Sequence, residues 1–172
     1  RHVGFGDGVY RSRDAGASWE NLGLKDSQHV SKILVHPKNP DVVWVAAQGP
    51  LWSKGGDRGL FKTTDGGKTW AKVLGAGEWT GVTDVAIDPR NADVLYAATW
   101  QRHRTVAGYV GGGPESGLHR STDGGTTFGT PVRVNDIEGE DCAAITVEMA
   151  NGSLAVLSAT LGAAQELSRL RF

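Results

Sequence analysis

Three acidic residues and two histidines carry side chains suited to hydrolysis, and all five fall in segments that we expect to be loops. Cleavage of a glycosidic bond needs two carboxylates on either side of the scissile bond, one acting as acid and the other as base or nucleophile. The acids that would supply such a pair are Asp26, Asp57 and Glu78. The sequence therefore allows a glycosidase-type site if these segments converge.

The histidines allow a second chemistry. His29 and His103, together with Asp26 or Glu78, offer ligands for a divalent metal that would activate water against a phosphoester or carboxyl ester. No metal-ligand spacing motif supports this, so the interpretation depends on the loops meeting. The predicted metal ligands are His29, His103 and Asp26. Across both chemistries, the candidate catalytic residues are Asp26, Asp57, Glu78, His29 and His103.

Tryptophans and arginines of the same segments are candidates for ligand binding. Trp52, Trp79 and Trp100 lie at loops or strand ends, where an indole either stacks on a sugar ring or packs within the loop. Arg102 and Arg104 flank His103, and their guanidinium groups suit a carboxylate or phosphate, although an exposed basic turn has the same composition. We expect a small-molecule or glycan ligand.

A short motif occurs three times and explains other conspicuous acids. The pattern Ser/Thr-x-Asp-x-Gly-x-x-aromatic, called the Asp motif below, spans residues 12–19, 63–70 and 121–128. Its hydroxyl and carboxylate can accept N–H bonds of a turn, its glycine supplies a positive φ, and its aromatic residue packs back on a sheet. Turn structure therefore accounts for Asp14, Asp65 and Asp123 without catalysis, and we expect Trp19 and Trp70 in the core.

Short apolar runs separated by turn residues predict strands between the motifs. In the second repeat these runs fall at 30–36, 42–48, 60–64 and 69–74. A Pro-x-Asn-x-Asp turn that begins at Pro37 recurs at Pro89. Four-stranded units repeating at about 50 residues are blades of a β-propeller. The expected fold is all-β, an incomplete propeller of two to three four-stranded blades over residues 1–132.

Alternate loops of a propeller blade fall on opposite faces, which predicts the residues that meet. The Asp motifs and the proline turns share one face. The other face collects longer segments, as functional loops tend to be, at 23–30, 48–59, 75–82 and 100–117. All the candidate residues above belong to these segments, so we expect them on one rim of the propeller.

The repeats resemble those of Asp-box (bacterial neuraminidase repeat) propellers, a group that includes sialidases, xyloglucanases and the sortilin luminal domain. Segments 6–29, 51–67 and 98–114 resemble more specifically the bacterial sortilin-like proteins often labelled glycosyl hydrolase. The resemblance covers residues 1–132 and implies the propeller fold and an exported origin, periplasmic or secreted. It leaves two functions open, a hydrolase-type propeller or a non-catalytic glycan- or peptide-binding and assembly propeller, because such propellers host both.

The repeat pattern stops near residue 140. Two apolar runs flank Asn151 and Gly152, a pair that favours a β-hairpin with a type I′ turn. Residues 140–172 resemble a strand pair from the C-terminal domain of the glucose–fructose oxidoreductase and inositol dehydrogenase family. We therefore assign residues 133–172 to a second segment of different origin. The nucleotide-binding half of that family is missing, so NAD is not expected as a cofactor.

Composition limits the partners. The net charge is −1 and no apolar run is long enough to span a bilayer, so we expect neither nucleic acid nor a membrane as partner. Three blades are fewer than the roughly four to eight of a closed ring, and open blade faces expose apolar surface and strand edges. We expect a homo-oligomer, with a dimer of two three-blade copies as the simplest closure.

Overall fold

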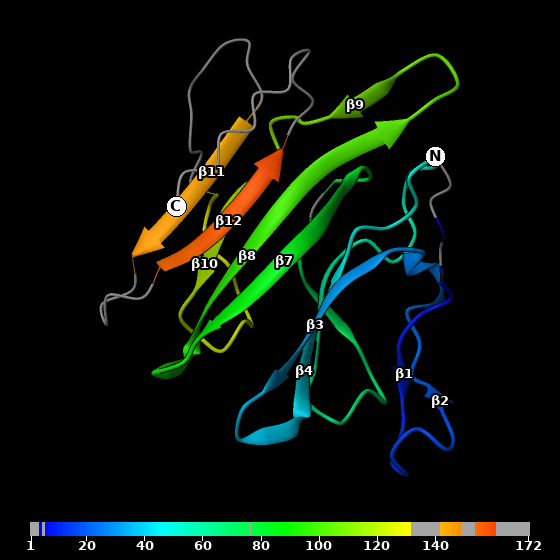
Figure 1. Cartoon of the computed structure of the whole chain (residues 1–172), viewed down its shortest axis with the longest axis vertical. Coiled ribbons are helices and arrows are strands. Elements are labelled where there is room, and N and C mark those ends of the chain that lie inside the picture. The colour runs from blue at the N-terminus through cyan, green and yellow to red at the C-terminus, as the bar shows by residue number, and fades with distance from the viewer. Residues whose placement is uncertain (1–3, 5, 76, 132–141, 149–153, 161–172) are drawn as a thin grey trace, which may run out of the picture. The chain divides into compact units, whose positions relative to one another are not determined.

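The regular secondary structure of the described residues consists almost entirely of antiparallel strands joined by turns and loops (Figure 1). The computed structural model describes residues 4, 6–75, 77–131, 142–148 and 154–160. The chain divides into two compact units, Arg1–Val132 and Arg133–Phe172. Within the described residues the single helical element is the 3₁₀ turn η1 (Lys25–Ser27), and no helix there is long and apolar enough to cross a membrane. The expected all-β class is confirmed.

One blade of the first unit is complete. Its four antiparallel strands follow one another in space as they do in sequence: β3 (Val30–His36), β4 (Asn39–Ala47), β5 (Gly59–Thr63) and β6 (Ala71–Leu74). These bounds lie within three residues of the predicted runs. We call this sheet blade 2.

The neighbouring blades are partial. The strands of blade 1 are β1 (Tyr10–Arg11) and β2 (Glu20–Asn21), and those of blade 3 are β7 (Thr80–Asp88), β8 (Asn91–Arg104) and β10 (Gly117–Ser121). Blade 3 has the order β10-β8-β7, and β9 (Tyr109–Gly111) pairs with the far end of β8. Blade 1 thus has the outer strand pair alone among the described residues.

The second unit contains the predicted hairpin. Strands β11 (Cys142–Glu148) and β12 (Leu154–Thr160) pair antiparallel along their full lengths. The Asn151-Gly152 turn that was predicted to join them lies outside the described residues.

Strand β4 connects the cores of the first unit because both of its faces are buried. Trp44 and Ala46 pack against blade 3, whereas Val45 and Ala47 pack with Val9 on the side of blade 1. All four β4 side chains have no exposed surface. The two-residue period of a strand therefore directs alternate residues into two separate blade interfaces.

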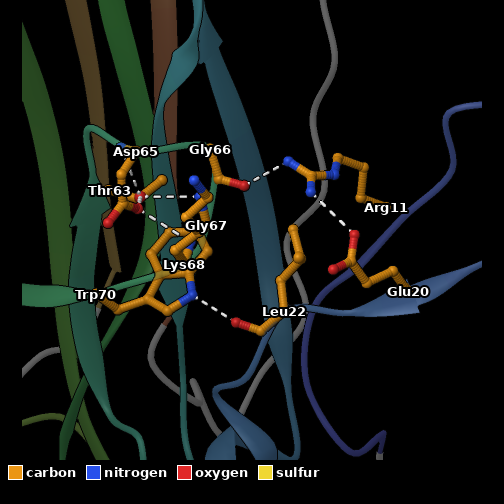
Figure 2. A network of polar contacts seen from close by, with 9 residues as sticks. All are labelled: Arg11, Glu20, Leu22, Thr63, Asp65, Gly66, Gly67, Lys68 and Trp70. Atoms are coloured by element: carbon orange, nitrogen blue, oxygen red, sulfur yellow. Dashed lines mark hydrogen bonds and ion pairs between the residues drawn. The ribbon is translucent and has the colours of Figure 1, made fainter.

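The Asp motif has the hydrogen bonds expected from its sequence (Figure 2). In the second copy, the Thr63 hydroxyl accepts the Gly67 N–H at 3.0 Å and donates to Asp65 Oδ1 at 2.7 Å. The Asp65 carboxylate in turn accepts the Thr69 N–H at 3.0 Å and the Thr69 hydroxyl at 2.6 Å. Gly67 has a φ of 89°, which a side chain would disfavour. The first and third copies repeat this pattern.

These bonds predict a loss of stability in acid. The Ser18 hydroxyl and N–H lower the pKa of Asp14 from 3.8 to about 2, and the Thr69 and Thr127 donors lower the pKa values of Asp65 and Asp123 further. Because the folded-state pKa values are depressed, the stabilisation is present above about pH 4 and is lost as the pH falls through about 2. We expect the urea midpoint to fall over this window and Asp14→Asn to flatten that fall. An unchanged slope in the variant would contradict the assignment.

The aromatic residues that end the motifs pack on the preceding blade. Trp70 is half-buried and its Nε1 donates to the Leu22 carbonyl of blade 1 at 2.7 Å, and Phe128 packs on the core around Trp44. Trp19 is instead 63% exposed. The expectation of a core position is therefore wrong for Trp19, because no described residues form a blade before it.

Candidate functional site

The loops expected to converge are joined by backbone hydrogen bonds. The Asp57 N–H donates to the Asp26 carbonyl at 3.2 Å, and the Gly55 N–H donates to the Glu78 carbonyl at 2.9 Å. Loop 48–58 is therefore held between the segment of Asp26 and the segment of Glu78. The three candidate acids lie on adjacent loops in the order Asp26, Asp57, Glu78.

The candidate acids differ in their contacts. Asp26 is exposed, and its N–H donates to the Asp57 carboxylate at 3.0 Å, so Asp57 already stabilises the loop contact. Glu78 forms an ion pair with Lys54 at 3.1 Å, in which both side chains are 64% exposed. Glu78 is thus exposed but paired with Lys54, and Asp57 is engaged with the backbone of the Asp26 segment.

Arg58 fixes the shape of loop 48–58, a role that the sequence analysis did not assign. It is 1% exposed, and its guanidinium donates to five main-chain carbonyls: those of Gln48, Pro50, Ser53, Gly55 and Trp79. Burial and the nearby charge of Arg102 lower the pKa of Arg58 to about 10, so it remains protonated at neutral pH.

The predicted ligand-binding residues come together around the end of β8. This strand reaches the neighbouring loops through hydrogen bonds from the Arg102 N–H to the Trp79 carbonyl and from the Arg104 N–H to the Leu51 carbonyl, both 3.0 Å long. The His103 ring lies 4.5 Å from the Trp79 ring between centroids. We define the rim cluster as Trp52, Trp79, Trp100, Arg102, His103, Arg104 and Tyr109.

Arginine and aromatic side chains alternate within the rim cluster. The Arg104 guanidinium carbon lies 5.5 Å from the Trp52 ring centroid and 6.0 Å from that of Tyr109. The Arg102 guanidinium carbon lies 5.2 Å from the Trp100 centroid. Such cation–π contacts orient the indole faces and place positive charge next to them. Trp52 is 59% exposed and is therefore open to a ligand.

Arg102 has unused hydrogen-bond donors. It is 8% exposed, and its Nε and one Nη have no partner among the described residues. Burial lowers the pKa of Arg102. Burial also raises the pKa of the neighbouring Tyr109, although the positive charges of Arg102 and Arg104 oppose this rise. The unpaired donors of this guanidinium are buried beside the half-buried Trp100 ring, and Trp52 is the exposed indole of the rim cluster.

The two histidines lie in different surroundings. His29 Nδ1 is 2.9 Å from the Gly49 carbonyl oxygen, and its buried Nε2 has no partner in the described part of the chain. His103 contacts Trp79 instead. Over the described residues, no group of three or more His, Cys, Asp or Glu side chains is arranged to hold a metal ion. The predicted set of His29, His103 and Asp26 is thus not assembled in this structure.

A cleft of about 560 Å³ lies away from the rim cluster, between blade 1 and the second Asp motif. Its lining includes Arg11, Arg13, Glu20 and Lys68 and none of the predicted site residues. The Arg11 guanidinium is already paired with Glu20 at 2.9 Å (Figure 2). We therefore place the candidate site at the rim cluster, where the predicted binding residues gather.

Comparison with known proteins agrees with the propeller architecture. The sequence profile of the family Sortilin-Vps10 (sortilin, neurotensin receptor 3) matches residues 7–150. No curated protein matches the chain. The match extends into the second unit, and nothing found supports the resemblance of residues 140–172 to inositol dehydrogenases.

Two GH74 proteins of known structure match part of this chain. An ancestral GH74 enzyme matches with 26% identity and a TM-score of 0.53, covering 72% of this chain and 15% of its own. The GH74 xyloglucanase from Xanthomonas campestris matches with 16% identity and a TM-score of 0.32, covering 74% of this chain and 27% of its own. The chain thus spans a small part of the length of either enzyme.

Proposed function

Because this chain belongs to the Sortilin-Vps10 family and shares its fold with an ancestral GH74 enzyme, we propose that it forms part of a hydrolase-type propeller whose rim binds a glycan. The observation that carries the proposal is the rim cluster, in which aromatic rings and arginines from two blades lie side by side. The proposal includes an exported location, in keeping with the family resemblance.

Glycan binding follows from the chemistry of the rim cluster. Trp52 offers an exposed indole face for the apolar face of a sugar ring, and Arg104 holds that face in place. Arg102 supplies donors for ring or hydroxyl oxygens from a site with little water. Stacking and directed hydrogen bonds together would fix the orientation of the sugar.

We propose Asp26 and Glu78 as the acid and base groups of glycoside cleavage. They lie on opposite sides of loop 48–58, which carries Trp52, so a sugar stacked on that indole would have a carboxylate on either side. Asp57 serves as the residue that positions the Asp26 segment. Because the described residues form no group of side chains arranged to hold a metal ion, a chelator arm in the assay tests whether turnover needs a metal at all.

Trp52→Ala tests the binding surface. Because Trp52 is exposed, its loss should change the free energy of unfolding by less than about 0.5 kcal/mol. Loss of a stacked ring should weaken glycan binding by up to about tenfold, measured by affinity electrophoresis against soluble polysaccharides. The control is Tyr10→Ala, an exposed aromatic on β1 outside the rim cluster. Equal binding by both variants would contradict a role for the rim cluster.

Turnover tests the catalytic assignment. Chromogenic glycosides, phosphoesters and carboxyl esters would be assayed with and without a chelator. Asp26→Asn and Glu78→Gln should each lower chelator-insensitive glycoside turnover by about a hundredfold or more. Asp93→Asn, an exposed acid on the other blade face, serves as the control. Chelator-sensitive turnover lost in His29→Ala or His103→Ala would move the assignment to a metal-assisted site.

A specific observation favours a second function, a non-catalytic glycan- or peptide-binding propeller. Two of the three acids are engaged in other contacts, Asp57 with the Asp26 N–H and Glu78 with Lys54. The matching family also takes its description from a receptor. Ligand binding that depends on Trp52, without turnover on any substrate class, would establish this function in place of the first.

A further inference from the structure

Two of the predicted site residues, Glu78 and Trp79, lie on the short stretch that joins β6 to β7. We call residues 77–80 the connecting segment. The Glu78 side chain is paired with Lys54, but both partners are 64% exposed, and ion pairs in water contribute little to stability. This pair is too weak to hold the segment, so its position depends on other contacts.

The Glu115 carboxylate contacts both ends of the connecting segment. The Thr80 hydroxyl donates to this carboxylate, and Thr80 is only 1% exposed. A hydrogen bond to a charged acceptor is about twice as strong as one between neutral groups. At the other end, a Cβ on Gly77 would collide with the same carboxylate. Glu115 therefore packs against the residue before Glu78 and binds the residue after Trp79.

The main chain of Glu115 is fixed independently of its carboxylate. The Thr99 hydroxyl donates to the Glu115 carbonyl at 2.8 Å, and the Glu115 N–H donates to Gln101 Oε1 at 3.4 Å. The Gln101 N–H in turn donates to the Ser116 hydroxyl at 3.0 Å. Strand β8 thus holds the Glu115 backbone, so removal of the side chain should leave its loop in place.

Loop 48–58 holds the connecting segment from the side of blade 2. The Gly55 N–H donates to the Glu78 carbonyl at 2.9 Å, and the Arg58 guanidinium donates to the Trp79 carbonyl at 3.1 Å. Glu115 supplies the contact from blade 3. The segment is therefore held from both blades, by groups whose own positions are fixed.

We infer that Glu115 is a positioning residue of the rim, which holds the connecting segment in place and thereby sets the positions of Glu78 and Trp79. The inference rests on the proposed function, in which Glu78 is one of the two carboxylates of glycoside cleavage. Displacement of a reacting group by about 1 Å can lower a rate by about a hundredfold. Glu115 thus acts on the reaction through Glu78 and touches no substrate itself.

Amide hydrogen exchange of the whole chain, followed by NMR, tests the contact without a substrate. The N–H groups of Gly55 and Arg102 donate to the carbonyls of Glu78 and Trp79, at 2.9 and 3.0 Å. Glu115→Ala should speed exchange at these two amides by about tenfold or more, as expected for loss of a hydrogen bond to a charged group.

An amide of the same strand provides the internal control. The Arg104 N–H donates to the Leu51 carbonyl at 3.0 Å and so reports on the contact of β8 with loop 48–58 without the connecting segment. Its exchange should not change in Glu115→Ala. Unchanged exchange at Gly55 and Arg102, or an equal acceleration at Arg104, would overturn the inference.

Three further variants separate the hydrogen bond from charge and from folding. Glu115→Gln should retain most of the protection, because its amide oxygen can still accept the Thr80 hydroxyl. Asp93→Ala, which removes an exposed acid on the other blade face, should have no effect. Should Glu115→Ala fail to fold, Gly77→Ala provides the second test, because its methyl group would displace the Glu115 carboxylate and should speed exchange at the same amides.

Glycoside turnover tests the link to the proposed reaction. Glu115→Ala should lower kcat by about tenfold or more and change KM by less than about twofold, since Trp52 lies on a different loop, and Glu115→Gln should recover most of kcat. In a Glu78→Gln background, Glu115→Ala should have no further effect. An equal fall of kcat in both backgrounds would overturn the positioning role. A wild type without turnover would contradict the proposed cleavage instead, and the exchange result would then decide the inference by itself.

Discussion

Trp44→Ala is expected to lower the free energy of unfolding by about 3–5 kcal/mol, the range for removing a large aromatic side chain from a core. Trp44 has no exposed surface and contacts the buried side chains of blade 3. A Cβ on Gly125 would collide with its Nε1, so the third Asp motif is shaped around this indole. Urea unfolding followed by circular dichroism measures the loss.

The repeat supplies a matched control for this substitution. Tyr96 occupies the equivalent position in blade 3, and it is half-buried because no blade among the described residues covers it. Tyr96→Ala should therefore cost clearly less than Trp44→Ala. Equal losses would show that Trp44 stabilises its own sheet rather than the interface between blades 2 and 3.

Arg58→Ala is expected to cost about 3 kcal/mol or more and to abolish glycan binding at the rim. Its removal leaves five main-chain carbonyls without their donor inside loop 48–58, and each buried, unsatisfied acceptor is costly. Trp52 belongs to the same loop and the Trp79 carbonyl is one of the five acceptors, so both indoles should lose their positions. Thermal unfolding and affinity electrophoresis measure the two effects separately.

Arg58→Lys distinguishes geometry from charge. Lysine keeps the positive charge, but its single ammonium cannot reach carbonyls arranged around a planar guanidinium. We therefore expect the lysine variant to recover little of the stability or the binding. Full recovery of stability and binding by Arg58→Lys would mean that the positive charge at position 58, rather than the five hydrogen bonds, accounts for the role of Arg58.

Local features of this fold were predictable because their causes are local. The Asp motif forms its turn from bonds among residues at most four positions apart, such as Thr63, Asp65 and Gly67, so the sequence contains the whole interaction. The strands of blade 2 were predictable for a similar reason, since turn residues delimit them. The gathering of the rim residues followed from the alternation of loops in a blade.

Features that depend on distant partners were not predictable. Arg58 obtains its role from main-chain carbonyls as distant in the sequence as that of Trp79. Except for the glycines around it, nothing in the adjacent sequence indicates this role. Trp19 has the same motif context as Trp70, yet it is exposed because its packing partner would belong to another blade. The ion pair between Lys54 and Glu78 likewise arises from tertiary placement alone.

The two-sided burial of β4 restricts how such repeats can change in length. Inserting one residue in β4 would exchange Trp44 and Ala46 with Val45 and Ala47 and disrupt both neighbouring interfaces at once. The loop that joins the second and third strands of a blade is not restricted in this way. It has 11 residues in blade 2, between Ala47 and Gly59, and 17 residues in blade 3, between Thr99 and Gly117. Evolution can therefore lengthen the rim to reach new ligands, whereas the number of blades changes only by duplication or loss of whole repeats.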